Sequence, residues 1–134
     1  MPSDVETFPV RTGEDVVRAR QIVRSRAMEI GFSLVEQTKI VTAASELARN
    51  TVIYGGGGEM RIQRVFQGER RSGLRLVFED QGPGIADIEL ALRDGFTSGN
   101  GLGLGLNGAR KLSHEFDIQS KLGAGTRVTI TRWK

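Results

Sequence analysis

The sequence of 134 residues contains no cysteine, and this absence excludes several kinds of chemistry. Without a thiol there is no disulfide framework, no thiolate metal site and no cysteine nucleophile. No apolar run approaches the roughly 18 residues that a membrane-spanning helix needs. The first ten residues, MPSDVETFPV, lack the basic and apolar regions of a secretory signal. We therefore expect a cytoplasmic protein that does not act on a membrane.

The sequence also lacks a strong charge of either sign. Its formal net charge is +3, with 26% charged and 38% hydrophobic residues, which is ordinary for a globular protein. The few aromatic residues do not alternate with arginines, as they do on surfaces that stack nucleic-acid bases. We expect no nucleic-acid partner. The length is that of a single domain, which we place at residues 1–134.

The order of predicted elements indicates an α+β fold. Thr12 with Asp15, and Ser33 with Glu36, have the spacing of helix-capping boxes. Hydrophobic periodicity predicts strands at 5–10, 61–66, 74–79, 118–121 and 126–133, and helices at 13–30, 34–54, 85–93 and from the glycine-rich segment to about 116. Strands in hairpins and helices in a separate group predict a two-layer α/β sandwich, with helices on one face of a mixed, mainly antiparallel sheet.

The second long helix carries a carboxylate and a carboxamide one turn apart. Glu46 and Asn50 stand at i and i+4, so they share one face. Oxygens so placed can share a magnesium ion, which favours few protein ligands, several waters and phosphate oxygens. The alternative is an exposed glutamate and an asparagine that caps the helix end.

The segment EDQGPGI places an aspartate directly after a predicted strand. Asp80 accepts hydrogen bonds only, so it suits a donor such as the exocyclic amine of adenine. Gly82 and Gly84 let the backbone approach a flat group closely, and the proline between them stiffens the turn. The alternative is an ordinary turn with no ligand.

The segment DGFTSGNGLGLGLNGARKL, residues 94–112, has glycine at alternate positions before a predicted helix. Backbone N–H groups exposed in this way can converge on a phosphate, aided by the helix N-terminus. Residues 103–108 match G-x-G-x-x-G, but no strand leads into them, which excludes a Rossmann site. No phosphate-binding loop of the G-x-x-x-x-G-K type occurs. The alternatives are a mobile linker and a lid over a nucleotide.

Other features have a structural and a functional interpretation. In GAGT, Thr126 offers a hydroxyl that both donates and accepts, or it simply begins a strand after a hairpin turn. The glycines at 55–58 are expected to form a flexible loop. The single histidine, His114, is expected at the surface or at a helix end. The arginines of the first helix form either a solvated face or a docking surface for an acidic partner: Arg18, Arg20, Arg24 and Arg26.

The order of these motifs resembles that of the GHKL ATPases. E-x-x-x-N on a helix, D-x-G-x-G after a strand, G-x-G-x-G before a helix and G-T before a strand follow one another in that superfamily, which includes gyrase, Hsp90, histidine kinases and MutL. The resemblance covers nearly the whole chain. It is greatest to the RsbT-type switch kinases among the small bacterial serine kinases and anti-sigma factors, through ELARNTVIYGGGGEM, EDQGPGIADIELALRDGFTSGNGLGLGLNGARKL and EFDIQSKLGAGTRVTITRW.

The resemblance implies the Bergerat ATP-binding fold, the cofactors ATP or ADP and Mg²⁺, and a set of site residues. Glu46 would orient or deprotonate the attacking hydroxyl, and Asn50 would be the magnesium ligand. Asp80 would bind adenine, and Thr126 would support it through water. Further nucleotide-binding positions are Gly82, Gly84, Ile85, Gly99, Asn100, Gly101, Leu102, Gly103, Leu104 and Gly105. Asn100 and Asn107 stand where such kinases commonly have glycine and proline, so the second is expected to loosen the lid.

The activity implied is phosphorylation of a serine or threonine on STAS-domain partners of a stressosome, followed by activation of a PP2C-type phosphatase. The resemblance leaves two alternatives open. One is a nucleotide-dependent anti-sigma factor that sequesters a sigma factor, although the YGGGGEM junction favours the kinase. The other is a detached histidine-kinase catalytic domain. A monomer or a weak homodimer is expected.

Overall fold

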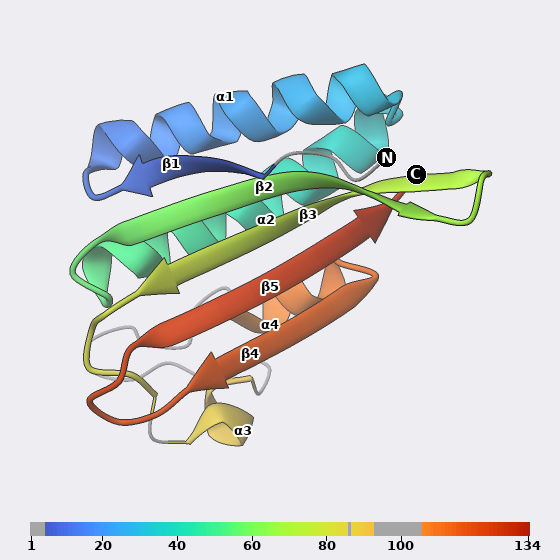
Figure 1. The fold of residues 1–134 in the computed structure, drawn as a ribbon. Coiled ribbons are helices and arrows are strands. Elements are labelled where there is room, and N and C mark those ends of the chain that lie inside the picture. Colours follow the sequence, from blue (N-terminus) through green and yellow to red (C-terminus); the bar gives the residue numbers. More distant parts are fainter. Residues whose placement is uncertain (1–4, 86, 93–105) are drawn as a thin grey trace.

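The computed structural model describes residues 5–85, 87–92 and 106–134, and these residues form two layers (Figure 1). Helices α1 and α2 and the short α4 cover one face of a single sheet, as Figure 1 shows. The elements are β1 (Glu6–Val10), α1 (Gly13–Ile30), α2 (Leu34–Ile53), β2 (Gly58–Gln67), β3 (Arg71–Asp80), α3 (Ile88–Ala91), α4 (Leu106–Lys111), β4 (Glu115–Ser120) and β5 (Thr126–Trp133). The predicted two-layer α+β sandwich is confirmed.

The five strands lie in the order β1-β2-β3-β5-β4, and every pair in this sheet is antiparallel. The sequence predicted a mixed sheet, and that detail is wrong for the described strands. The cause is the connection between β3 and β5. The chain passes through α3 and α4 to the edge strand β4 and returns by a tight turn, so β5 enters the centre of the sheet antiparallel to β3.

Successive side chains of the central strands point to opposite faces of the sheet, one covered by the helices and one open. Met60 and Ile62 on β2 and Leu76 and Phe78 on β3 are buried beneath the helices. Burying one such side chain contributes about 1.5–3 kcal/mol to folding. The residues between them point to the open face, where Glu79 bonds arginines of neighbouring strands. The open face thus carries cross-strand charge pairs in place of a second layer.

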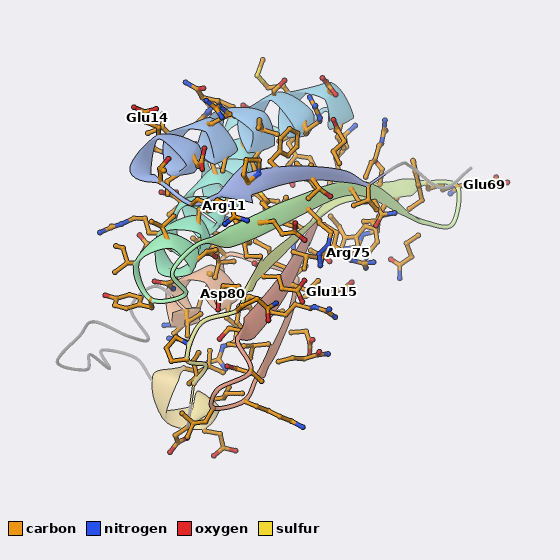
Figure 2. The ribbon with its side chains drawn as sticks, turned by 60° about the vertical axis from the view of Figure 1, so that its left-hand side comes forward. Arg11, Glu14, Glu69, Arg75, Asp80 and Glu115 are labelled. Atoms are coloured by element: carbon orange, nitrogen blue, oxygen red, sulfur yellow. The ribbon has the colours of Figure 1, made fainter. Side chains whose placement is uncertain are left out.

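A charged pair on the open face spans β5, from β3 on one side to β4 on the other. Figure 2 shows Arg75 and Glu115 close together there, and the pair is 3.9 Å apart between Nη2 and the carboxylate. Glu115 also accepts the indole N–H of Trp133 at 2.8 Å, and the guanidinium of Arg71 lies 4.9 Å from the Trp133 ring centroid. These contacts bury Trp133 although it lies on the face without helices.

The helix starts follow the predicted capping boxes. The Thr12 hydroxyl accepts the N–H of Asp15, and the Asp15 carboxylate accepts the N–H of Thr12. Ser33 and Glu36 exchange the same two bonds at the start of α2. Helix α1 ends at Gly31, whose φ of 95° is accessible to glycine at low cost. Neither long helix in the described residues has the apolar length needed to cross a bilayer.

Two predicted boundaries in the second half of the chain are wrong. The helix expected to reach Phe116 ends at Lys111, and Phe116 lies in β4. The sequence EFDIQS alternates between exposed and half-buried positions, and this period of two overrides the helical periodicity before it. The helix expected at 85–93 is Ile88–Ala91 in the described residues, and the N–H of Ile85, three residues before it, donates to the hydroxyl of Ser120 on β4.

Arg132 fastens the far end of β5 to α4. It lies opposite Leu74 on the face covered by helices and is 9% exposed. Its Nη1 donates to the carbonyl oxygen of Leu112, just after α4, at 2.9 Å. Its Nε is the one buried side-chain polar atom of the described residues that has no hydrogen-bond partner. The guanidinium therefore holds the end of α4 at some cost in desolvation.

We predict that Ser33→Ala lowers the free energy of unfolding by about 1 kcal/mol, because it leaves an N–H of the first turn of α2 without its acceptor. Urea denaturation measures this change. The control is Ser25→Ala, an exposed position inside α1, which is expected to leave stability unchanged or slightly raised. Equal losses in both variants would show that the cap contributes nothing.

Candidate functional site

A cavity of about 370 Å³ lies where the end of α2 meets the ends of the central strands. Its apolar wall comes from α2, β3 and β5, and it includes Leu47, Phe78 and Val128. Its polar groups are carried by α2, the end of β3 and the start of β5. The loop after β3 and the first residue of α4 complete the rim. Of the predicted site residues, the cavity contains Asn50, Asp80, Gly84, Ile85 and Thr126.

Asp80 is the polar centre of this cavity. It is the last residue of β3, and it pairs with Gly58 on β2 and Thr126 on β5. Figure 2 shows it at the end of the sheet, beside the loop that follows β3. Burial raises the pKa of its carboxyl above the ordinary value, and the N–H groups of Gly82 and Thr126 oppose this shift. The N–H of Gly82 lies 2.9 Å from Asp80 Oδ1.

The glycines after α2 make the space that Asp80 occupies. A β-carbon at Gly55 would lie 2.3 Å from Asp80 Cγ, and one at Gly82 would lie 2.7 Å from the Cα of Gly55. Such approaches are too short for any other residue. The N–H of Gly57 donates to the carbonyl oxygen of Thr51 at 2.8 Å, which ties the turn to the helix end. The segment expected to be a flexible loop therefore has a packing role, which four consecutive glycines next to a site helix could have suggested.

The loop after β3 is fastened to the turn between β4 and β5. Gly84 has a φ of 77°, and a β-carbon there would lie 2.0 Å from the carbonyl oxygen of Lys121. The N–H of Gly123 donates to the carbonyl oxygen of Pro83 at 2.7 Å. Gly84 is thus required both by its backbone conformation and by this close approach, whereas Gly82 supports Asp80 without lining the cavity.

Ser120 joins these parts, although it was not among the predicted site residues. It is the last residue of β4, opposite Thr126. Its Oγ lies 2.8 Å from the Ile85 nitrogen, 3.0 Å from the Gly125 carbonyl oxygen and 2.8 Å from Thr126 Oγ1. A serine six residues before the threonine of a G-x-G-T turn was the available signal.

Glu46 and Asn50 lie on one face of α2, as predicted, but they differ in position. Asn50 lines the cavity, whereas Glu46, one turn earlier, is partly exposed and does not. Asn50 also makes a further interaction within the protein. A carboxamide oxygen at the cavity and a carboxylate one turn away are hard donors that suit a magnesium ion held mainly by water and phosphate.

The remaining predicted positions have mixed outcomes. The segment from Gly99 to Gly105 lies outside the described residues, so its predicted phosphate contacts stay predictions. Asn107 is buried in the first turn of α4, and its Oδ1 accepts Arg110 Nη2 at 2.6 Å. His114 is at the surface, as expected, and its Nδ1 accepts the N–H of Trp133 at 2.8 Å.

The arginines of α1 do not form one uniform surface. Arg26 bonds the carboxylate of Glu6, and Arg18 lies 3.5 Å from Asp15. These two guanidinium groups are balanced by acidic neighbours. Within the described part of the chain, Arg20 and Arg24 have no ion pair. A solvated face is therefore the favoured interpretation for Arg18 and Arg26. A docking surface for an acidic partner stays a hypothesis for Arg20 and Arg24.

We predict that Gly55→Ala displaces the Asp80 carboxylate and lowers affinity for an adenine nucleotide at least about tenfold, or about 1.4 kcal/mol. Isothermal titration calorimetry with ADP measures this loss. The control is Gly13→Ala, where a β-carbon meets nothing within 4 Å. Unchanged ADP affinity in Gly55→Ala would show that the position of Asp80 does not matter for binding.

Curated relatives cover nearly the whole chain. It is 43% identical over 131 residues to the serine/threonine-protein kinase RsbT of Bacillus subtilis (strain 168), covering 98% of each chain. It is 28% identical over 118 residues to the anti-sigma F factor of Thermoanaerobacter sp. (strain X514), covering 86% of this chain and 82% of that one.

Solved structures share the fold. A crystal structure of the RsbU and RsbW domains of a Mycobacterium tuberculosis protein aligns with a TM-score of 0.63 at 22% identity, over 98% of this chain and 32% of that one. The mycobacterial sensor histidine kinase MprB aligns with a TM-score of 0.53 at 21% identity, over 95% of this chain and 97% of that one. At these identities the likeness concerns the fold alone.

One family model matches the part of the chain that carries the cavity. It spans residues 35–134, which contain α2 except for its first residue, the four strands after it and every residue of the cavity. Together with the relative that is 43% identical over 98% of the chain, this match shows the family of the protein. The chain belongs to the histidine kinase-, DNA gyrase B- and HSP90-like ATPase family.

Proposed function

We propose that this protein is a cytoplasmic, magnesium-dependent serine/threonine protein kinase that uses ATP. The observation that carries the proposal is the joint presence of Asp80 and Asn50 in one cavity of an ATPase-family fold. The 43% identity over 98% of the chain to a protein named serine/threonine-protein kinase supports the choice of kinase over other family members.

In this proposal the cavity binds the adenine base. The Asp80 carboxylate accepts a hydrogen bond from the exocyclic amine, and the apolar wall formed by Leu47, Phe78 and Val128 receives the ring. Gly84 allows the backbone to approach the face of the base. This pairing of one charged acceptor with an apolar slot discriminates adenine from bases that present an acceptor at the same position.

The triphosphate would extend from this cavity towards α2 and α4. Asn50 would hold a magnesium ion through its carboxamide oxygen, and the ion when bound would neutralise phosphate charge. The glycines from 99 to 105 would supply backbone N–H groups to the phosphates. These roles follow from the donor chemistry of the residues and from the resemblance.

Glu46 is proposed as the base that handles the attacking hydroxyl. The hydroxyl oxygen of a partner serine or threonine would form the new bond to the γ-phosphorus, and the bond to the ADP oxygen would break. The hydroxyl proton would pass to the Glu46 carboxylate. Because Glu46 is partly exposed at the side of the cavity, a partner could present its hydroxyl there without entering the base pocket.

The partners proposed are STAS-domain proteins as substrates and a PP2C-type phosphatase as the target activated after release. A second candidate function is a nucleotide-dependent anti-sigma factor. It is favoured by the 28% identity to anti-sigma F factors over 86% of this chain. Both functions use the same nucleotide site, so they differ in what the bound nucleotide controls.

We predict opposite effects of Asp80→Asn on stability and on binding. Because the folded state raises the pKa of this carboxyl, the ionised form destabilises the fold at neutral pH, and stability rises as pH falls from the folded pKa towards the ordinary value of 3.8. An amide removes this cost, so the free protein melts at a higher temperature. It also presents an N–H to the adenine amine, which costs about 1–3 kcal/mol of ADP binding.

Thermal melts with and without ADP measure both effects. The control is Asp117→Asn on the open face of the sheet, where the side chain is exposed. This control is expected to change neither the melting temperature nor its increase with ADP. A full ADP-induced increase in Asp80→Asn would exclude Asp80 as the base-binding group.

We predict that the protein transfers the γ-phosphate of Mg·ATP to a serine or threonine of a STAS-domain protein, and that Glu46→Gln and Asn50→Ala lower the rate at least about 100-fold. Radiolabel transfer with mass-spectrometric site mapping measures this. The control is Glu69→Gln, which lies at the opposite end of β2 and β3 from Asp80 (Figure 2).

Transfer that survives in Glu46→Gln at the normal rate would exclude Glu46 as the base. Binding of ATP without transfer to any STAS protein, together with capture of a sigma factor that depends on the nucleotide, would favour the anti-sigma function instead.

A further inference from the structure

Ser120 lies next to the cavity, within hydrogen-bond distance of the Thr126 hydroxyl that lines it. Its Oγ is within hydrogen-bond distance of three groups: the Ile85 N–H, the Gly125 carbonyl and the Thr126 hydroxyl. Ser120 does not line the 370 Å³ cavity, whereas Thr126 does, and a neighbouring hollow on the other side is lined by Ser120, Thr126 and Asp80 together. An effect of Ser120 on a ligand in the 370 Å³ cavity therefore passes through Thr126 or Ile85, which both line it.

The direction of each hydrogen bond follows from counting protons. The Ile85 nitrogen can only donate and the Gly125 carbonyl can only accept. Ser120 has a single O–H, and it donates this proton to the Gly125 oxygen at 3.0 Å. If Ser120 donated to Thr126 instead, its oxygen would face the Gly125 oxygen at that distance with no proton between them. The Thr126 hydroxyl must therefore donate to Ser120.

This direction fixes what Thr126 presents to the cavity. With its only proton directed to Ser120, Thr126 Oγ1 retains lone pairs alone, so it acts as an acceptor. Asp80, paired with Thr126 across the two strands, is an acceptor as well. On the side of the cavity formed by β3 and β5, the two polar side chains, Asp80 and Thr126, are thus both acceptors. A ligand there must supply protons, directly or through a water that donates to Thr126.

We propose that Ser120 is a specificity-determining positioning residue, which selects an amino-substituted purine over an oxo-substituted one by holding the Thr126 proton away from the cavity. This inference rests on the proposed nucleotide-binding function. Adenine presents an amine at position 6, whereas hypoxanthine presents a carbonyl oxygen, which would face two acceptors. The selection against the oxo group depends on a proton that never touches the ligand.

The test compares ADP with IDP, whose bases differ in the amine or oxo group at position 6 and in the proton that hypoxanthine carries on N1. Isothermal titration calorimetry gives both dissociation constants for the wild type, Ser120→Ala and Ser120→Thr. Ser120→Ala frees the Thr126 proton to point into the cavity and donate to the IDP oxygen. We expect the preference for ADP over IDP to fall about tenfold in Ser120→Ala. The reason is that an unfavourable contact between two acceptors is replaced by a hydrogen bond from the Thr126 hydroxyl to the IDP oxygen. Ser120→Thr keeps the hydroxyl and should retain the preference.

A purely structural role for Ser120 makes a different prediction. It would weaken ADP and IDP by the same factor and leave their ratio unchanged, and this result would overturn the inference. Thr126→Val supplies a second route that does not require Ser120→Ala to fold. Removing the hydroxyl should reduce the preference for ADP by itself, and adding Ser120→Ala to Thr126→Val should then leave the ratio unchanged. A preference unaffected by Thr126→Val would also overturn the inference.

The outcome for the wild type separates this inference from the proposed function. Failure of the wild type to bind either nucleotide would contradict both. Tight binding of ADP together with an ADP-to-IDP ratio that does not respond to Ser120 would contradict the inference alone and leave the kinase proposal in place.

Discussion

The partly buried carboxylate of Asp80 is the constraint on which the site depends. A carboxyl group at the end of a central strand loses hydration, and the structure compensates with backbone N–H groups from Gly82 and Thr126. Room for the group requires glycine at position 55, where any β-carbon would overlap it. The turn after α2, the loop after β3 and the start of β5 are therefore shaped around one charge. Its desolvation lowers stability in exchange for a strong acceptor in the cavity.

Much of the fold could be predicted from local signals. Both capping boxes and the two long helices were confirmed, because these signals act within a few residues of one another. The local signals around Phe116 compete, and its pairing with Ile130 on β5 places it in a strand. The same applies to Ile85, whose N–H is taken by Ser120 from 35 residues away. Contacts between distant segments decided each of these cases.

The site shows the same division. Asp80, Asn50 and Thr126 could be identified from their spacing and from a resemblance, because their side chains carry the chemistry. The packing role of Gly55 and the hydrogen-bond role of Ser120 were not predicted, because these residues act on other residues and not on a ligand. A sequence pattern indicates which groups are available for chemistry. Only the folded arrangement shows which of their lone pairs and protons are already engaged.

Strand β5 runs from the cavity at one end of the sheet to the contact with the end of α4 at the other. At one end Thr126 lines the cavity, and at the other Arg132 grips the carbonyl of Leu112 behind α4. Withdrawing that carbonyl would leave a second nitrogen of a buried guanidinium without a partner, in addition to Nε. The hydrogen bond from Arg132 thus fixes the C-terminal end of α4 to β5. Through β5, the position of α4 is therefore connected to the side of the cavity that Thr126 forms.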